Sequence, residues 1–248
     1  MNRKALIISN PGEPGAETYC AGVSKDVASY HSFLLSPIGG LWQDSEITRM
    51  DRPTKFDLKL KLFDFTYCDY ALVIFAGHGF HSVQDNSTFI ELRTGHDFDS
   101  KDLRLKVKQT LILDCCRQRV ALLTEDRALR EKLAKAGPVL HPDDCRKYYD
   151  ERITSCADEL VVMYACSVGQ SAADDSRTGG VYSSNLLDAS KGWTRESNID
   201  TNSKYSILSV VSAHEKAVSL VERSRGGRQT PHIEKPRIDP YFPFCIVA

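Results

Sequence analysis

The sequence lacks three features that would each indicate a broad class of protein. There is no basic excess, because 32 Lys and Arg stand against 33 Asp and Glu among 248 residues, a net charge of -1. The longest nearly apolar run, residues 71–77, is far too short to span a bilayer. The apolar stretch near the N-terminus ends at Pro11, too early for a signal peptide. We therefore expect a cytoplasmic protein that binds neither nucleic acid in general nor membranes.

Closely spaced cysteine pairs are also missing. No Cys-x-x-Cys motif occurs, although zinc ribbons and thioredoxin-like redox sites require one. A disulfide framework would be typical of a much shorter secreted chain. We expect most of the thiols to be small buried hydrophobic groups, with at most one or two taking part in chemistry. The eight cysteines are Cys20, Cys68, Cys115, Cys116, Cys145, Cys156, Cys166 and Cys245.

What the sequence does contain is a regular alternation of short apolar runs and helix-like stretches. Hydrophobic residues make up 42% of the chain, enough to bury the core of one substantial domain. Alternating strands and helices favour an α/β sandwich around a mostly parallel sheet. The runs predict strands at residues 4–9, 46–50, 70–76, 109–114 and 159–165, and helices at 20–35, 56–65, 181–189 and 206–223.

One charged segment interrupts this alternation. Residues 117–156 carry many Lys, Arg, Asp and Glu between two core strands. One interpretation is a pair of surface helices with solvated faces. The other is a linker that is processed or regulated, since exposed segments rich in Arg and Lys are readily cut.

The residues that follow two of the predicted strands point to thiol chemistry. In open α/β sheets, ligands bind beyond the carboxyl ends of the strands. His78 follows the strand at 70–76, and Cys115 and Cys116 follow the strand at 109–114. A histidine or a cysteine pair after a strand is, taken alone, more often structural. Together they place an imidazole and a thiol at one sheet edge. A thiolate nucleophile needs such a partner to manage protons, so we predict a Cys/His dyad.

Two other enzyme or binding classes are disfavoured. A cysteine phosphatase needs an Arg six residues after the nucleophile, whereas Ala121 and Leu122 occupy those positions. A nucleotide-binding loop would need a Gly-rich run ending in Gly-Lys-Ser or Gly-Lys-Thr after the first strand. Residues 10–15 carry glycines but no such ending, and their two prolines lack N–H donors.

The motifs Phe-Ala-Gly-His-Gly and Leu-Ile-Leu-Asp-Cys-Cys resemble the caspase and metacaspase superfamily of cysteine peptidases. The resemblance implies the caspase-haemoglobinase fold, a three-layer α/β/α sandwich with a mostly parallel six-stranded sheet. It implies that His78 is the catalytic histidine and Cys116 the nucleophile, with Gly79 and Cys116 forming the oxyanion hole. Further similar segments are residues 22–26, 164–166, 170–172, 179–183 and 229–231.

The resemblance covers nearly the whole chain, so we expect one caspase-like peptidase domain over residues 1–248. Residues 1–116 would correspond to the large-subunit part and residues 157–248 to the small-subunit part. The charged insert or linker at 117–156 would separate them.

The resemblance also implies a specificity. The family residue two positions before the nucleophile lines the pocket for the residue that precedes the cut. Metacaspases, which cut after Arg or Lys, have Asp there, as this chain does at Asp114, and Asp26 matches the other pocket acid. Two carboxylates favour a guanidinium, which donates paired charge-assisted hydrogen bonds. We therefore predict cleavage after Arg, with Lys second.

Two departures from the metacaspase pattern affect these expectations. Arg117 follows the nucleophile where metacaspases have His, and we expect it either to help lower the thiol pKa or to face solvent. Calcium-dependent relatives carry a dense acidic stretch after the catalytic His. Here that region holds only Asp85, Glu91, Asp97 and Asp99, too sparse for an ion that takes six to eight oxygens. We expect no metal or other cofactor and no calcium dependence.

The sequence thus predicts a cysteine endopeptidase whose partner is a protein or peptide substrate with a basic residue before the cut. The alternative is an inactive caspase-like scaffold. We expect an upstream activator protein or processing to switch the enzyme on, and family analogy alone suggests a prokaryotic immunity or cell-death effector. Autocleavage is predicted within 117–156, after Arg127, Arg130, Lys132, Lys135, Arg146, Lys147 or Arg152.

Overall fold

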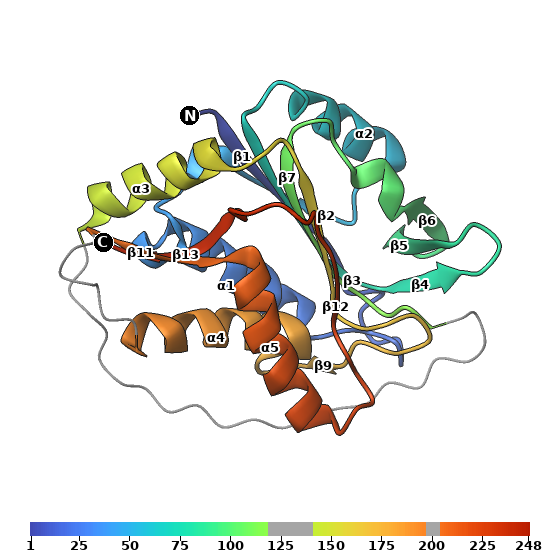
Figure 1. Ribbon diagram of the computed structural model, residues 1–248. Coiled ribbons are helices and arrows are strands. Elements are labelled where there is room, and N and C mark those ends of the chain that lie inside the picture. The colour runs from blue at the N-terminus through green and yellow to red at the C-terminus, as the bar shows by residue number, and fades with distance from the viewer. Residues whose placement is uncertain (119–140, 197–203) are drawn as a thin grey trace.

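A six-stranded sheet forms the middle layer of the protein, for which a computed structural model describes residues 1–118, 141–196 and 204–248. The strand order is β12-β8-β7-β3-β1-β2, and only the edge strand β12 runs antiparallel to its neighbour. The predicted three-layer α/β/α architecture is confirmed (Figure 1). The strands are β1 (Arg3–Asn10), β2 (Ile47–Asp51), β3 (Tyr70–Gly77), β7 (Lys108–Asp114), β8 (Leu160–Tyr164) and β12 (His232–Glu234).

The central strands are apolar on both faces because both faces of the sheet are covered. One face packs against four helices and a two-stranded ribbon. The other packs against a single helix and a three-stranded sheet (Figure 1). On the first side lie α1 (Val23–Leu35), α3 (Pro142–Ser155), α4 (Val181–Glu196), α5 (Val210–Arg225), β11 (Ser206–Ser209) and β13 (Pro243–Val247); on the second lie α2 (Lys55–Asp64), β4 (Gly79–Ser82), β5 (Ser87–Arg93) and β6 (His96–Asp99).

The predicted helix at 206–223 is wrong at its start. Ser206–Ser209 form strand β11, which pairs antiparallel with β13. The helix begins only after Ser209, whose hydroxyl caps it by accepting a hydrogen bond from the Ser212 N–H at 3.1 Å. Ile207 and Leu208 therefore belong to a strand. Pairing with a segment almost 40 residues away overrides the local helical spacing.

The charged segment at 117–156 contains a helix that is part of the core. In α3, the side chains of Cys145, Tyr149 and Ile153 lie on one buried face. Because these residues recur every four positions, the segment after residue 141 is an amphipathic helix with a solvated opposite face. Residues 119–140 of the predicted insert lie outside the described residues.

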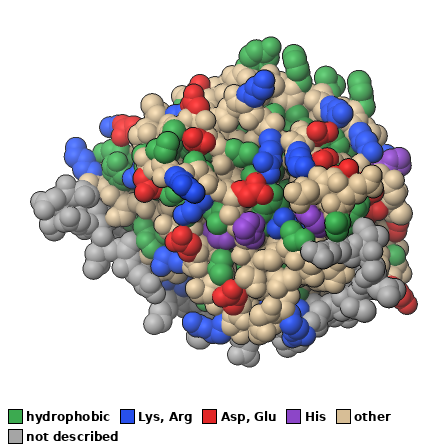
Figure 2. All heavy atoms as spheres, turned by 45° about the vertical axis from the view of Figure 1, so that its right-hand side comes forward, with side chains coloured by type: hydrophobic (Ala, Val, Ile, Leu, Met, Phe, Trp, Pro, Cys, Tyr) green, Lys and Arg blue, Asp and Glu red, His purple; other side chains and the backbone are tan. Residues whose placement is uncertain are grey.

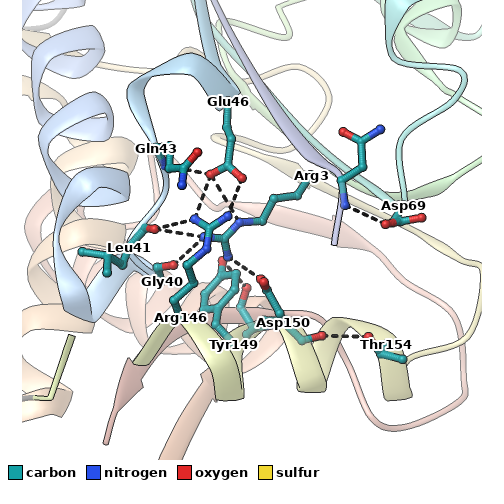
Figure 3. A network of polar contacts seen from close by, with 12 residues as sticks. Arg3, Gly40, Leu41, Gln43, Glu46, Asp69, Arg146, Tyr149, Asp150 and Thr154 are labelled. Atoms are coloured by element: carbon teal, nitrogen blue, oxygen red, sulfur yellow. Dashed lines mark hydrogen bonds and ion pairs between the residues drawn. The ribbon is translucent and has the colours of Figure 1, made fainter. Parts of the chain in front are cut away.

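A buried arginine attaches α3 to the first strand of the sheet. The Arg3 guanidinium lies 2.8 Å from the Asp150 carboxylate and donates a hydrogen bond to the Gly40 carbonyl at 2.6 Å (Figure 3). It stacks at 4.4 Å over the Trp42 ring. The neighbouring Arg146 on α3 pairs with Glu46 at 2.6 Å. These contacts join the start of the chain to the helix that follows residue 141.

Candidate active site

A cavity of about 160 Å³ opens at the carboxyl ends of the central strands, the lower end of the sheet in Figure 1. This is the edge at which open α/β sheets bind ligands. The predicted residues His78, Cys116, Asp26 and Asp114 all line this cavity. Its other lining residues are Thr18, Tyr19, Cys20, Ala21, Val23, Gly77, Ser171, Ala172, Ala173, Asp174, Ser176 and Gly180.

The sheet register brings the histidine and the cysteines to the same place. Strands β3 and β7 are adjacent and parallel, with Ala76 opposite Asp114, so the chain leaves both strands side by side. Gly77 makes the turn into His78 with a φ of +148°, and a Cβ there would lie 2.2 Å from the Asn10 carbonyl oxygen. Only glycine fits this position, since the backbone of β1 approaches so closely.

The two adjacent cysteines have different environments. Cys115 is buried in the core, as expected, and burial raises the pKa of its thiol well above the ordinary value. Cys116 is partly exposed to the cavity, and its Sγ lies 3.6 Å from the Ala172 carbonyl oxygen. Cys116 is therefore the thiol of the pair that a substrate can reach.

A second accessible thiol, Cys20, lies against the catalytic-histidine candidate and was missed by sequence reasoning. Its Sγ is 3.7 Å from Nε2 and 3.9 Å from Nδ1 of His78. The loop after β1 carries Cys20 to the same sheet edge as Cys116. The available signal was its position after the first strand, but a lone cysteine in a loop gives no periodic pattern to read.

Gly79, the oxyanion-hole candidate, directly follows His78 in the chain. It begins β4 and is not among the residues that line the cavity. A Cβ at this position would lie 2.8 Å from Cys115 Sγ, so the Gly79 backbone packs tightly against Cys115. The oxyanion role of its N–H and that of Cys116 stays a prediction. His81 is buried two residues further on and donates its backbone N–H to the Gln118 carbonyl at 3.0 Å.

Arg117 does not face solvent, so one of the two expectations for it is wrong. Its side chain is buried, and Nε donates to Thr88 Oγ1 at 2.9 Å. The guanidinium donates to the Cys166 carbonyl at 3.2 Å and stacks 3.9 Å from the Tyr164 ring. These contacts fix the loop that carries Cys116 to β5 and to the end of β8.

The two predicted pocket acids meet at the base of the cavity. Asp26 on α1 and Asp114 at the end of β7 are buried and both face Gly180. The Gly180 N–H donates to both Asp26 carboxylate oxygens, at 3.0 and 2.9 Å. A Cβ at position 180 would lie 2.5 Å from Asp114 Oδ2, so a side chain there would fill the space between the acids.

Burial makes both carboxyls weak acids. Desolvation raises the pKa of Asp114 to about 6, and Asp174 adds a smaller like-charge effect. Desolvation followed by the charge of Asp114 raises the pKa of Asp26 well above its ordinary value. A cation entering this pocket would restore the favourable environment that the carboxylates lose on burial.

Three residues that sequence reasoning did not select complete the acidic pocket. Ser183 donates both its N–H, at 3.0 Å, and its hydroxyl, at 2.5 Å, to Asp114 Oδ2. The Tyr30 hydroxyl donates to Ser183 Oγ at 3.1 Å. Asp174 adds a third carboxylate to the cavity wall and accepts from the Gly22 N–H at 2.8 Å. The adjacent acids at 174–175 were visible in the sequence, but nothing local relates them to Asp26.

Three of the four acidic residues after His78 accept hydrogen bonds from residues close to them in the chain. Glu91 accepts from the Gly95 N–H at 2.8 Å, and Asp85 bonds the Ser82 hydroxyl at 2.6 Å. Asp99 accepts from the Lys101 N–H at 2.8 Å. Within the described residues, no group of three or more His, Cys, Asp or Glu side chains is arranged to hold a metal ion.

No helix in the same parts of the chain is long and apolar enough to cross a membrane.

Comparisons with known proteins show the family and the fold of the chain. The family model described as the caspase domain matches residues 2–242. Among solved structures, the chain is similar to caspase-1 from Spodoptera frugiperda at 10% sequence identity, with a TM-score of 0.57. That match covers 94% of this chain and 86% of the other, and it shows a shared fold. No curated protein sequence matches.

Proposed function

This chain belongs to the caspase domain family, a family of cysteine peptidases, and we propose that it is an endopeptidase that cleaves after arginine, with lysine second. The observation that carries the proposal is one cavity that holds a thiol and an imidazole beside two buried carboxylates. A thiol with an imidazole beside it can attack a peptide bond, and a pair of carboxylates can bind a cation.

The proposed reaction begins with Cys116. Its thiolate attacks the scissile carbonyl carbon, and the N–H groups of Gly79 and Cys116 hold the oxyanion. His78 then gives a proton to the leaving amine as the C–N bond breaks, which leaves an acyl-enzyme thioester. His78 next takes a proton from water, whose oxygen attacks the thioester and releases the acid product and the Cys116 thiolate.

The specificity follows from Asp26 and Asp114. A planar guanidinium can donate to two carboxylates at once, whereas a lysine ammonium is a point charge that matches the pair less well. An acidic side chain would bring a third negative charge beside two buried carboxylates, which costs several kcal/mol. Ser183 occupies one oxygen of Asp114 and so leaves the other for a substrate cation.

Activation is proposed to require processing or an activator protein. Of the proposed cleavage sites, Arg127, Arg130, Lys132 and Lys135 lie outside the described residues. The remaining three, Arg146, Lys147 and Arg152, are on α3, where cleavage would first need the helix to unfold.

The test is a panel of peptide amides that carry Arg, Lys, Gln or Asp before the cut, assayed with and without calcium. We expect cleavage of the Arg and Lys peptides by the wild type and none by Cys116→Ala or His78→Ala. Cleavage after Asp would contradict the proposed specificity but would leave the proposal of a Cys/His dyad intact.

A silent panel is resolved by a thiol-reactive peptide probe that carries Arg at its reactive end. Labelling of Cys116, mapped by mass spectrometry, would identify an enzyme that awaits activation. Absence of labelling at Cys116, both before and after limited proteolysis of the chain, would favour the inactive scaffold instead.

A further inference from the structure

Helix α2 carries apolar side chains on two opposite faces. Leu58, Leu62 and Phe65 point into the core beneath the sheet. On the other side stand Phe56, Leu60 and Phe63, and Tyr67 continues the row in the turn after the helix; these four side chains are between 57% and 76% exposed. We call these four residues the α2 stripe.

The α2 stripe gathers half of the exposed large hydrophobic side chains in the described part of the chain. A fifth, Met1, precedes Asn2, whose side-chain amide donates a hydrogen bond to the Tyr67 carbonyl at 3.2 Å. Green side chains stand out along the upper edge of Figure 2, the side on which Figure 1 places α2. Single exposed apolar residues are ordinary, but a contiguous row of this kind marks an interaction site.

The spacing of the α2 stripe fits another helix. Its residues follow one another at intervals of four, three and four. Within the helix, Phe56, Leu60 and Phe63 take successive d, a and d positions of a heptad pattern, and Tyr67 extends the row into the turn after Asp64. Phe63 and Tyr67 already pack edge to face, with ring centroids 6.0 Å apart. Such a seam accepts the side chains of a second helix between its own.

The charges beside the α2 stripe are complementary to a second copy of themselves. Lys59 occupies the g position on one flank, and Asp64 occupies the e position of the following heptad on the other. In a parallel pair of helices, g of one helix faces e of the next heptad on its partner. Lys59 would therefore meet Asp64 of the second copy, twice by symmetry.

An antiparallel pair is disfavoured by the same charges. It brings g opposite g, so that Lys59 meets Lys59 of the second copy, and it brings the e-position acids Asp57 and Asp64 together. Asp64 is now paired with Lys61 at 3.0 Å in an exposed contact, which is weak enough to exchange.

We propose that the α2 stripe is a homodimer interface in which two copies of α2 pack in parallel about a two-fold axis. The same patch serves both copies, as an isologous interface requires. Four exposed residues per copy make a small interface, so the dimer forms reversibly and grows with concentration. The stripe lies on the face of the sheet that faces away from α1 and α4, and no stripe residue lines the catalytic cavity.

The first test is sedimentation equilibrium of the full chain over a wide concentration range. We expect a monomer–dimer equilibrium in the wild type, and a shift to monomer, by at least tenfold in Kd, for Leu60→Gln and Phe63→Gln. Val83→Gln is the matched control, because Val83 is 66% exposed but lies outside the stripe. Circular dichroism melts check that the variants fold.

Charge exchange tests the orientation. Lys59→Asp and Asp64→Lys should each weaken the dimer, and the double variant should restore it. A cross-linking variant checks the register: Leu60→Cys in a Cys20→Ala and Cys116→Ala background should form a disulfide with itself, since identical a positions face each other in a parallel pair.

Three results would overturn the proposal. A chain that stays monomeric at every concentration has no such interface. A dimer that is unchanged by Leu60→Gln and Phe63→Gln uses another surface. Failure of Leu60→Cys to cross-link in a chain that dimerises, together with cross-linking of a Leu60→Cys and Phe63→Cys mixture, would mean an antiparallel pair.

Discussion

At the scale of single residues, the most informative feature is that two carboxyl groups line the same cavity as the Cys116 thiol. Asp26 and Asp114 are buried, share the space around Gly180, and have pKa values raised by desolvation. Acids held in this state bind a cation strongly when it arrives, because the cation removes the cost of their burial. Two predictions follow from the proposed specificity.

Replacing Asp114 by Asn should weaken recognition of arginine without moving the dyad. The amide keeps the shape and can still accept from Ser183, but it loses one charge. We expect kcat/KM for an Arg peptide to fall about 10- to 100-fold, the worth of a hydrogen bond between charged groups. Steady-state kinetics should show the loss mostly in KM. Asp158→Asn, an exposed carboxylate far from the cavity, is the control and should change neither parameter.

The pH dependence of cation binding should report the same carboxyl. Below its pKa of about 6, Asp114 is neutral and attracts a guanidinium poorly; above it, the carboxylate is charged. Inhibition by agmatine, which is a simple guanidinium compound, should therefore tighten as the pH rises from 5 to 7. Asp114→Asn should flatten this profile. An equally steep profile in the variant would assign the titration to another group.

At the scale of elements, the contacts between β1 and α3 hold together parts of the chain that are far apart in sequence. Arg3 is fully buried, and its pKa is lowered by desolvation, although the charge of Asp150 acts in the opposite direction. The guanidinium remains charged, forms ion pairs with Asp150 and Glu46, and donates hydrogen bonds to the carbonyls of Gly40 and Leu41. Removing one partner of such a group leaves the others buried and unpaired.

Arg3→Met should therefore destabilise the protein more than the same substitution at an exposed arginine. We expect the free energy of unfolding to fall by about 3 kcal/mol, measured by urea denaturation. Arg3→Lys should recover only part of this, because an ammonium cannot stack on Trp42 and donate in several directions. Arg49→Met, an exposed residue on the adjacent β2, is the matched control. Equal stabilities of the Arg3 and Arg49 variants would contradict the assignment.

At the scale of the whole molecule, the two halves of the chain share one sheet and one core. Strand β7 precedes residues 119–140, strand β8 follows them, and the two pair in parallel over five residues. The main core also mixes residues from both halves, such as Tyr30 with Tyr182 and Trp42 with Tyr149. The shared sheet and core therefore do not require an unbroken peptide chain between β7 and β8.

A single cut within residues 119–140 should leave the two fragments associated. After limited proteolysis with trypsin, size-exclusion chromatography in native buffer should show one peak that contains both fragments, and denaturant should separate them. The buried sheet pairing and shared core supply the reason, since both stay intact. Fragments that separate in native buffer would mean that the halves are held together mainly by the peptide connection.

Local pattern was enough to predict most of the sheet and the meeting of His78 and Cys116 at one cavity. The apolar runs at β3, β7 and β8 are hydrophobic on both faces, which only a covered parallel strand requires, and their ends place His78 and Cys116 at one edge. The family resemblance added the roles of Asp26 and Asp114, and the structure puts both in the same cavity. The interpretation of the charged stretch as surface helices agrees with a helix at α3 but missed its buried face, which consists of only three residues.

Periodicity and turn chemistry along the chain were enough to give the main parallel strands, most of the helices around them and the residue types at the strand ends. Tertiary structure alone decided which distant groups meet. Ser183 on Asp114, Cys20 on His78 and the burial of Arg117 join residues from separate elements. The strand β11 likewise exists only because β13 lies beside it. Such contacts arise from packing and from pairing across the sheet, and no spacing along the chain encodes them.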